Sequence, residues 1–406
     1  MVNKSSTIMH KLIKLLIIST FLDAYAIIYV GTYPVTVFTL VAVLVITVGI
    51  YRSIAMKKLL INVSGGIAIL MMIYVFLNFI MNGANNWTSL LLCEFFFCII
   101  IFSYRQVTKE EFDEYIKVFQ LGMNILAVYG IYQLVARMYS LPLSDIVIDN
   151  HMVTGFNWTN STYIAGIYAQ RSNAIFREPS FFSQYLAINI LLYTVQLIKN
   201  RRSMKYVAII VINAIAMILS FSGTGFIILI FGGIIYLIVI KKDNKTVYRI
   251  AKFGIPILVV FIVILNTQIG TYFINRLSEV FVYTANNVSG YVRFRSGTDV
   301  LKAAWSTNFL YGIGIGVSDE FITSISNYYQ GMTINGFYRP AVELGLIGFV
   351  IWLGFIISFW KKRNEASNIQ MLLCILFPFM ICHETFMSNY YWILLYLLNV
   401  KIKRKD

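Results

Sequence analysis

Charged residues are scarce in this 406-residue chain: Asp, Glu, Lys and Arg make up 13% of it, whereas hydrophobic residues make up 59%. Average globular proteins carry about 25% charged and about 45–50% apolar residues. A chain of this composition cannot cover its surface with polar groups, so a lipid bilayer must form part of its solvent. The scarcity of charge therefore excludes a soluble enzyme, a disordered protein and a nucleic-acid-binding module.

Cysteine is also scarce, and its positions exclude two common structural devices. All four cysteines lie inside apolar stretches, and their spacing is typical of neither a disulfide framework nor a zinc site. We interpret each of them as a small buried hydrophobic residue. The regions that we place outside the membrane contain no Asp-x-Asp motif, so we expect neither a metal ion nor another cofactor.

Long apolar runs, by contrast, are abundant. A membrane-spanning helix needs about 20 mostly apolar residues. Scanning for such runs predicts an all-α integral membrane protein with about 12 transmembrane helices (11–13), in a single polytopic domain over residues 1–406. The candidate spans are 12–30, 33–51, 59–81, 88–104, 115–139, 180–198, 206–221, 223–240, 250–268, 341–360, 369–386 and 388–400.

The basic residues indicate how the chain crosses the membrane. Most of the 33 Lys and Arg residues fall in alternate connections between the predicted spans, and in the two terminal segments. Because cytoplasmic connections carry the excess of Lys and Arg, we predict that both termini are cytoplasmic. The formal net charge of +15 then comes mostly from the basic residues that keep these connections in the cytoplasm, and it does not indicate a nucleic-acid partner.

Two connections on the predicted external side are long, at about 140–179 and about 269–340. Long loops in a compact architecture are usually functional or disordered, and the many aromatic residues here argue against disorder. Seven of the eight external basic residues are arginines, a residue suited to bidentate binding of phosphate or carboxylate. They are Arg137, Arg171, Arg177, Arg276, Arg293, Arg295 and Arg339. Pairing with external acidic residues is the alternative for each of them.

Three predicted spans begin at the external face, where the positive ends of their helix dipoles would lie. Arg177-Glu178-Pro179 and Arg339-Pro340 open two of them, with proline in the first turn. Ser222-Gly223-Thr224-Gly225 opens the third, where free amides could hold an anion. If these ends converge, they form a cationic, metal-free site. For the Ser222 segment, a plain tight turn between packed helices is the alternative.

Two acidic residues and one histidine need separate interpretation. Asp23 and Glu94 fall inside predicted spans, where a carboxylate is costly unless it is paired or faces a cavity. A proton- or ion-coupled transporter therefore stays open, although no matching pair of broken spans supports it. His383 closes a span at the external face, where it could serve as a base or as an interfacial hydrogen-bonding residue.

Four ordered segments over about 170–350 resemble one known family. They are Arg177-Glu178-Pro179-Ser180-Phe181-Phe182; Ser220-Phe221-Ser222-Gly223-Thr224-Gly225; Arg293-x-Arg295 leading into Tyr311-Gly312-Ile313-Gly314-Ile315-Gly316; and Asn335 with Arg339-Pro340-Ala341-Val342-Glu343-Leu344-Gly345-Leu346-Ile347-Gly348. This set resembles the Wzy-type O-antigen and capsule polymerases and the related O-antigen ligases. The ligase-like pattern has a His-Asn pair where this chain has Ile334-Asn335, which argues against a ligase.

The resemblance implies a GT-C-like membrane protein of the bacterial inner (cytoplasmic) membrane and a metal-independent glycosyltransferase activity. The implied substrate is an undecaprenyl-pyrophosphate-linked oligosaccharide, and the implied reaction transfers the growing glycan to the next lipid-linked repeat unit at the external face. A chain-length-regulating co-polymerase and a flippase are the implied protein partners.

The resemblance also implies roles for particular residues. Those implied to be catalytic are Arg177, Glu178, Glu343 and His383. Those implied to bind the diphosphate or the glycan are Arg171, Arg293, Arg295, Arg339, Ser222, Gly223, Thr224 and Asn335. As the base for the acceptor hydroxyl, Glu178 ranks before Glu343 and His383. Glu343 has an alternative role as the ion-pair partner that orients an arginine.

Two other functions stay open beside the polymerase, namely an O-antigen ligase with a different acceptor and a polysaccharide flippase or transporter. Substitution is expected to separate enzyme from carrier. Removal of Asp23 should cripple a carrier and spare a polymerase. Arg177→Ala should abolish polymerisation while single units are still exported.

Overall fold

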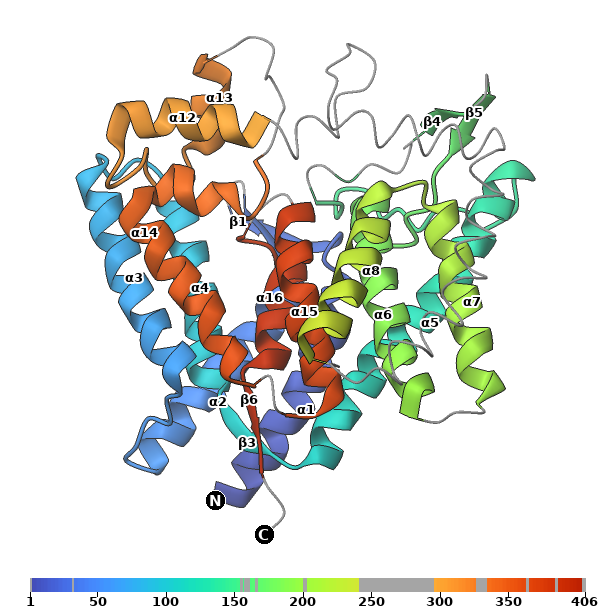
Figure 1. The fold of residues 1–406 in the computed structure, drawn as a ribbon, viewed down its shortest axis with the longest axis horizontal. Coiled ribbons are helices and arrows are strands. Elements are labelled where there is room, and N and C mark those ends of the chain that lie inside the picture. The colour runs from blue at the N-terminus through green and yellow to red at the C-terminus, as the bar shows by residue number, and fades with distance from the viewer. Residues whose placement is uncertain are drawn as a thin grey trace.

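The computed structural model describes residues 2–30, 33–153, 156, 161–164, 167–199, 203–240, 296–325, 334–362, 365–383 and 386–403. These residues are mostly helical (Figure 1). The helices are α1 (Val2–Thr20), α2 (Val37–Ala55), α3 (Val63–Met81), α4 (Trp87–Ser103), α5 (Lys109–Met138), α6 (Pro179–Lys199), α7 (Met204–Leu219), α8 (Gly223–Ile235), η1 (Tyr236–Ile240), α12 (Ser296–Asn308), α13 (Ser318–Ile325), α14 (Tyr338–Ser358), η3 (Phe359–Lys362), α15 (Ser367–Cys382) and α16 (Asn389–Leu398). The strands are β1 (Ala26–Val30), β2 (Tyr33–Thr36), β3 (Arg105–Val107), β4 (Ser161–Ile164), β5 (Ile167–Gln170) and β6 (Val400–Ile402).

Several of these helices have the length and composition of membrane spans. Five in the described chain are long and apolar enough to cross a membrane: Val37–Ala55, Val63–Met81, Lys109–Met138, Pro179–Lys199 and Tyr338–Lys362. Four shorter apolar helices accompany them: Trp87–Ser103, Met204–Leu219, Gly223–Ile238 and Ser367–Cys382. The prediction of a mostly helical membrane protein is confirmed at this level. The predicted span 250–268 and residues 269–295 of the second predicted loop lie outside the described residues.

The structure corrects the first two predicted spans. Helix α1 ends at Thr20 instead of continuing to residue 30, and β1 pairs with β2 in an antiparallel hairpin before α2 begins. Residues 27–30 form a run of β-branched and aromatic residues, which favours a strand over a helix. Thr36 then caps α2, since its side chain accepts a hydrogen bond from the Thr39 amide. Asp23 therefore lies in the turn after α1, and its predicted position in the middle of a span was wrong.

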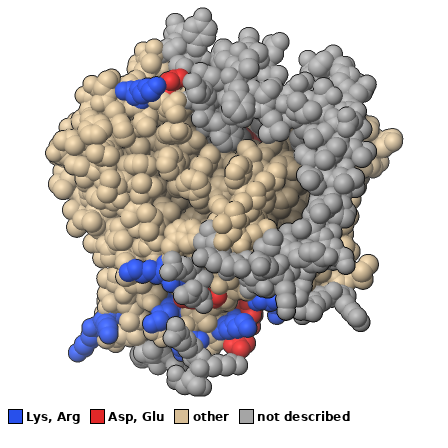
Figure 2. Space-filling model, viewed as in Figure 1, with Lys and Arg blue, Asp and Glu red and all other residues tan. Residues whose placement is uncertain are grey.

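The two ends of the helical body differ in composition. The start of α1 and strand β6 lie at one end, whereas α12, α13 and the β4–β5 hairpin lie at the other (Figure 1). Strand β6 pairs in parallel with β3, so the C-terminal segment is fastened to the connection between α4 and α5. Most Lys and Arg side chains visible in Figure 2 gather at the end that carries β6, below a broad surface without charge.

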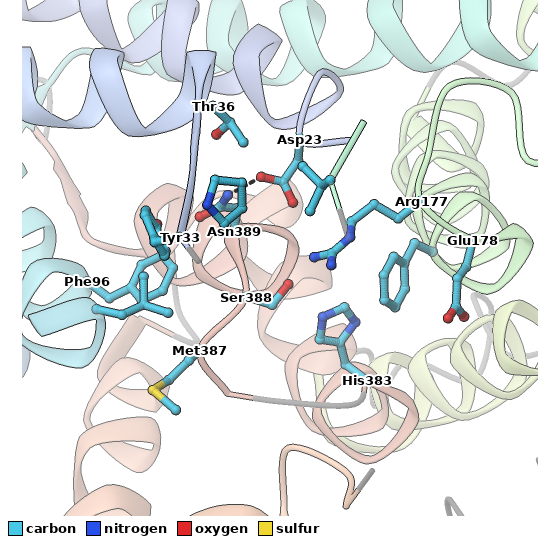
Figure 3. Close-up of a pocket in the computed structure, with 14 residues that line it drawn as sticks. Asp23, Tyr33, Thr36, Phe96, Arg177, Glu178, His383, Met387, Ser388 and Asn389 are labelled. Carbon is cyan, nitrogen blue, oxygen red and sulfur yellow. Dashed lines mark hydrogen bonds between the residues drawn. The ribbon is translucent and has the colours of Figure 1, made fainter. Parts of the chain in front are cut away.

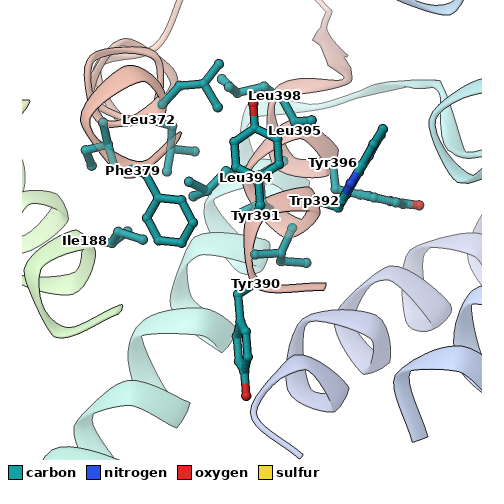
Figure 4. Close-up of a cluster of buried hydrophobic side chains, with 14 of the residues drawn as sticks. Ile188, Leu372, Phe379, Tyr390, Tyr391, Trp392, Leu394, Leu395, Tyr396 and Leu398 are labelled. Atoms are coloured by element: carbon teal, nitrogen blue, oxygen red, sulfur yellow. The ribbon is translucent and has the colours of Figure 1, made fainter. Parts of the chain in front are cut away.

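Helix α16 forms the centre of the core although it has only ten residues (Figure 4). All residues from Tyr390 to Leu398 are buried, as expected of a helix that is hydrophobic on every side. The Trp392 ring stacks on Phe96 of α4 with 5.0 Å between ring centroids. Because α16 is enclosed along its length, the residues just before and at its start are held firmly in place.

Helix α6 is fixed by polar contacts inside the bundle. The Asn189 amide donates to Asn124 of α5 at 3.0 Å and to Asn213 of α7 at 2.9 Å. Asn189 and Asn213 are fully buried. Amide pairs of this kind hold helices together where no water competes for the hydrogen bonds. The triangle sets the position of α6, and therefore of the residues that precede it.

Candidate functional site

A cavity of about 290 Å³ lies where four segments meet: the turn after α1, the β1–β2 hairpin, the start of α6 and the connection between α15 and α16 (Figure 3). Helix α4 closes it from another side. The residues that line it are Asp23, Tyr33, Pro34, Thr36, Leu92, Phe96, Val153, Arg177, Glu178, Phe181, His383, Met387, Ser388 and Asn389. Three of the twelve site residues predicted from the sequence are among them, namely Arg177, Glu178 and His383.

Arg177 reaches the cavity from a segment that is bound tightly to α5. The side-chain oxygen of Gln133 accepts hydrogen bonds from the Asn173 amide at 3.1 Å and the Ala174 amide at 2.8 Å. The Asn173 side chain in turn donates to the Phe176 carbonyl at 2.7 Å. Arg177 follows this turn and points toward Asp23 and His383 (Figure 3). Its backbone is therefore fixed on a rigid helix although the residue belongs to a loop.

Asp23 faces Arg177 across the cavity. Its turn is tied to residues 151–153, since the Val153 amide donates to the Ala24 carbonyl at 3.0 Å. The Asp23 side chain is buried, and its carboxylate accepts a hydrogen bond from the Asn389 amide at the start of α16. Burial raises the pKa of the Asp23 carboxyl, while the Arg177 charge and the Asn389 hydrogen bond act in the opposite direction.

The ring of His383 is oriented by its neighbours at the end of α15. Its Nδ1 lies 3.1 Å from the side-chain oxygen of Gln184, whose amide group donates to the Cys382 carbonyl at 3.2 Å. Because Gln184 presents its oxygen to the ring, Nδ1 is the nitrogen that carries a proton. The ring stacks on Phe379 and also contacts Phe181, with centroids 5.2 Å and 4.8 Å away. His383 is thus held in one tautomer and one orientation.

Glu178 lines the same cavity, but its carboxylate is directed elsewhere. In Figure 3 it points away from both Arg177 and His383. One of its oxygens accepts a hydrogen bond from the Ser180 hydroxyl at 2.7 Å. Among the three predicted bases, the geometry favours His383 over Glu178.

Arg339 and Glu343 form a separate cluster at the start of α14. The Arg339 guanidinium donates to the Glu343 carboxylate at 2.8 Å and lies 3.6 Å from Asp319 of α13. The Ser318 hydroxyl donates to the same Glu343 oxygen at 2.8 Å. Glu343 has no exposed surface, and neither it nor Arg339 lines the cavity. Glu343 therefore has the alternative role that the sequence left open, as the ion-pair partner that orients an arginine.

The glycine-rich segment 311–316 and Asn335 contact the start of α14, where this second cluster lies. The amides of Ile313 and Gly314 donate to the carbonyls of Val342 at 3.1 Å and Glu343 at 2.9 Å. The Asn335 side chain accepts from the Phe337 and Tyr338 amides and so caps the start of α14. These contacts bind the segment between α12 and α13 to α14.

The predicted anion cradle at the start of α8 packs against α6 on one side. The Thr224 hydroxyl contacts the Ser180 carbonyl at 3.4 Å, and the Ser183 hydroxyl contacts the Ser222 carbonyl at the same distance. A Cβ atom on Gly225 would lie 2.6 Å from the Ser183 carbonyl oxygen, so only glycine permits this approach. The segment is thus a turn packed against α6, and its binding of an anion stays a prediction.

The remaining predicted residues lie away from the cavity or outside the described chain. The Arg171 guanidinium donates to the Ser220 carbonyl at 3.1 Å. Arg293 and Arg295 fall outside the described residues. Polar groups of the cavity that were not predicted to belong to it include Asp23, Asn389 and Ser388. Asp23 did carry a signal, since a carboxylate in an apolar stretch must be paired or face a cavity.

Known proteins do not identify the chain further. No family model matches it, and comparison with curated proteins found no match. Its class is accordingly that of a mostly helical membrane protein with a cavity that contains an arginine, a histidine and an aspartate. Among the described residues, no group of three or more His, Cys, Asp or Glu side chains is arranged to hold a metal ion.

Proposed function

We propose that this protein is a polysaccharide polymerase of the bacterial inner membrane, with about twelve spans and a GT-C-like architecture. It joins undecaprenyl-pyrophosphate-linked repeat units at the external face by transferring the growing glycan to the next lipid-linked unit. The observation that carries the proposal is the meeting of Arg177 and His383 in one cavity. The arginine belongs to the family-like segment 177–182, and the histidine comes from a segment about 200 residues later in the chain.

The reaction would need two groups from the protein. The acceptor hydroxyl attacks the anomeric carbon of the growing glycan, and the bond between that carbon and the diphosphate oxygen breaks. The electron pair leaves with the diphosphate, where the Arg177 guanidinium stabilises the added charge. The imidazole of His383 takes the proton of the attacking hydroxyl. The His383 ring is oriented by Gln184, and the backbone that precedes Arg177 is held by Gln133.

The size of the cavity limits what it encloses. Its volume of about 290 Å³ lies just below the range for small-molecule sites, which is about 300–1,000 Å³. We infer that it encloses the diphosphate and the sugar ring attached to it, while the rest of the glycan and the polyprenyl chain extend beyond it.

An O-antigen ligase is the second candidate function, and one contact favours it. The carbonyl of His383 accepts a hydrogen bond at 2.7 Å from the Gly336 amide, next to Ile334-Asn335. His383 therefore lies near position 334, where the ligase-like pattern has its histidine. The absence of a histidine at position 334 thus argues less strongly against a ligase than the sequence indicated. The two differ in their acceptor, so the product must distinguish them.

A flippase loses its main support. The carboxylate that suggested ion coupling, Asp23, faces Arg177 in the cavity. Removal of Asp23 is consequently expected to disturb a polymerase as well, and this substitution cannot separate enzyme from carrier.

The proposal is tested by gel analysis of surface polysaccharide from a strain that lacks the gene, complemented with wild-type protein, Arg177→Ala or Arg177→Lys. We expect the deletion to reduce the ladder to one anchored repeat unit. Arg177→Ala should restore at most about 1% of the polymer at a normal protein level, because one lost charge-stabilising donor costs about 10²–10³ in rate. Accumulation of lipid-linked polymer without anchored glycan would instead identify a ligase. Single units confined to the cytoplasmic side would identify a flippase.

A further inference from the structure

Three segments that are distant in the sequence bring a polar group each to one side of the cavity. Asp23 comes from the turn after α1, Arg177 from the turn before α6 and Asn389 from the first residue of α16. Figure 3 shows the Asp23 carboxylate between the Asn389 amide and the Arg177 guanidinium. The dashed line in that view is the hydrogen bond that Asn389 donates to Asp23.

The frame around Asp23 is rigid. The side chain is only 5% exposed, and the flanking backbone is bound to residues 151–153 through Ala24 and Ala26. Asn389 begins the helix that forms the centre of the core, so the amide that holds the carboxylate cannot move easily. The carboxylate is thus fixed from two sides, with Arg177 opposite.

A buried carboxylate that is fixed in this way has an energetic cost unless a cation compensates it. Arg177 is the cation that faces it, and an arginine side chain has several rotatable bonds whose freedom must be lost before it can act at one point. A fixed negative charge reduces that freedom, because it favours the rotamers that bring the guanidinium into the cavity. Neither Asp23 nor Asn389 has to contact the substrate for this effect.

We propose that Asp23, held by Asn389, is a positioning residue that directs the Arg177 guanidinium toward the leaving diphosphate. This inference rests on the proposed polymerase function and adds to it two residues that the family-like segments do not contain. Asp23 acts through Arg177, so its contribution depends on the presence of the guanidinium. The pair Asp23–Asn389 should therefore be energetically coupled to Arg177.

A second aspartate–asparagine pair, outside the cavity, offers a matched control. Asp113 in the first turns of α5 accepts a hydrogen bond at 3.4 Å from the amide of Asn368 in α15, which is another aspartate–asparagine pair between distant segments. The substitution Asp113→Asn removes the same charge from a similar pair outside the cavity. Asp23→Asn keeps the shape and the accepting oxygen but removes the charge that faces Arg177.

The experiment measures polymer formation by the purified full-length protein from lipid-linked repeat units isolated from the deletion strain. Asp23→Asn is expected to lower kcat/KM by about 10- to 100-fold, as a small displacement of a reacting group does. Asp113→Asn should stay within about 2-fold of wild type, and Asp23→Glu should recover part of the loss. In an Arg177→Lys background, Asp23→Asn should reduce the remaining activity by less than about 3-fold, because the guanidinium it directs is already absent.

Three results would overturn the positioning role. They are wild-type activity of Asp23→Asn, equal losses in the wild-type and Arg177→Lys backgrounds, and an equal loss in Asp113→Asn. If Asp23→Asn does not accumulate in the membrane, Asn389→Ser is measured in the same way, and unchanged activity at a normal level overturns the role. Failure of the proposed function is distinguishable, since wild-type protein would then make no polymer from the same units.

Discussion

Two arginines that look alike in the sequence have different surroundings in the structure. Arg177 lies two residues before Pro179 and Arg339 directly before Pro340, each near the start of a helix. Arg339 has a glutamate four residues later, on the same face of the helix, and the two form a buried ion pair at 2.8 Å. The residue four positions after Arg177 is Phe181, which cannot form an ion pair with it and lines the same cavity.

Arg339 lies on the same helix as its partner Glu343, whereas Arg177 lies in the turn before α6 and reaches into the cavity. An arginine whose partner lies on its own helix is oriented locally, and its charge is used to hold segments together. An arginine that faces an apolar residue must find its partners on other elements, as Arg177 does with Asp23 from the turn after α1. The partners of Arg177 converge from several segments and line a cavity, whereas the partner of Arg339 lies on the same helix and stabilises the packing of α14.

Substitution of Arg339 tests most directly whether the two arginines have different roles. We expect Arg339→Ala to lower the free energy of unfolding by about 3–5 kcal/mol, because the fully buried Glu343 carboxylate would lose its guanidinium partner. Arg177→Ala should lower it by less, because the Asp23 carboxylate that loses its facing cation lines a cavity and keeps the hydrogen bond from Asn389. Thermal and denaturant unfolding of the two purified variants in detergent would measure the difference.

A double variant tests the cause of that loss. Arg339→Met with Glu343→Leu removes both charges and keeps the volume, so it should recover most of the stability that Arg339→Ala loses. If Arg339→Ala unfolds like wild type but makes no polymer, then Arg339 belongs to the reaction site, and the contrast between the two arginines is wrong.

Substitutions of His383 and Glu178 test which of these two cavity residues is the base. His383→Ala is expected to reduce the rate of polymer formation by about 100-fold, as loss of a general base does. Glu178→Gln should stay within about 3-fold, because its carboxylate points away from Arg177 and its bond with Ser180 survives with an amide oxygen. Single-turnover rates with lipid-linked units would compare the two. A large loss in Glu178→Gln with full activity in His383→Ala would restore the order derived from the sequence.

Much of the helical framework was predictable from the sequence, because it follows from local apolar runs. The predicted spans 59–81, 88–104 and 180–198 agree closely with helices α3, α4 and α6. The β1–β2 hairpin was missed, since Ala26–Val30 is as apolar as a helix segment and only its β-branched residues distinguish it. Apolar content alone does not separate a short strand from the end of a span.

The site was predictable only in part. Arg177 and His383 could be named because unusual local sequence surrounds them. The partnership of Asp23 with Asn389 joins residues that are 366 positions apart, and no local pattern encodes such a contact. The pairing of Arg339 with Glu343 was accessible, because a spacing of four residues places both on one helix face. Contacts within one helix can thus be inferred from the sequence, whereas convergence of separate turns needs the fold.

The smallest expected effects concern the start of α8, where two glycines two positions apart differ in their surroundings. Gly225→Ala should destabilise the protein by about 1–3 kcal/mol, because the new methyl group would meet the Ser183 backbone. Gly223 has open space around its Cβ position, so Gly223→Ala should stabilise the helix by about 0.4–1 kcal/mol and leave polymer formation unchanged. Unfolding and activity are measured on both variants. A loss of activity in a stable Gly223→Ala protein would mean that this turn binds an anion, and it would move the site from the Arg177 cavity toward α8.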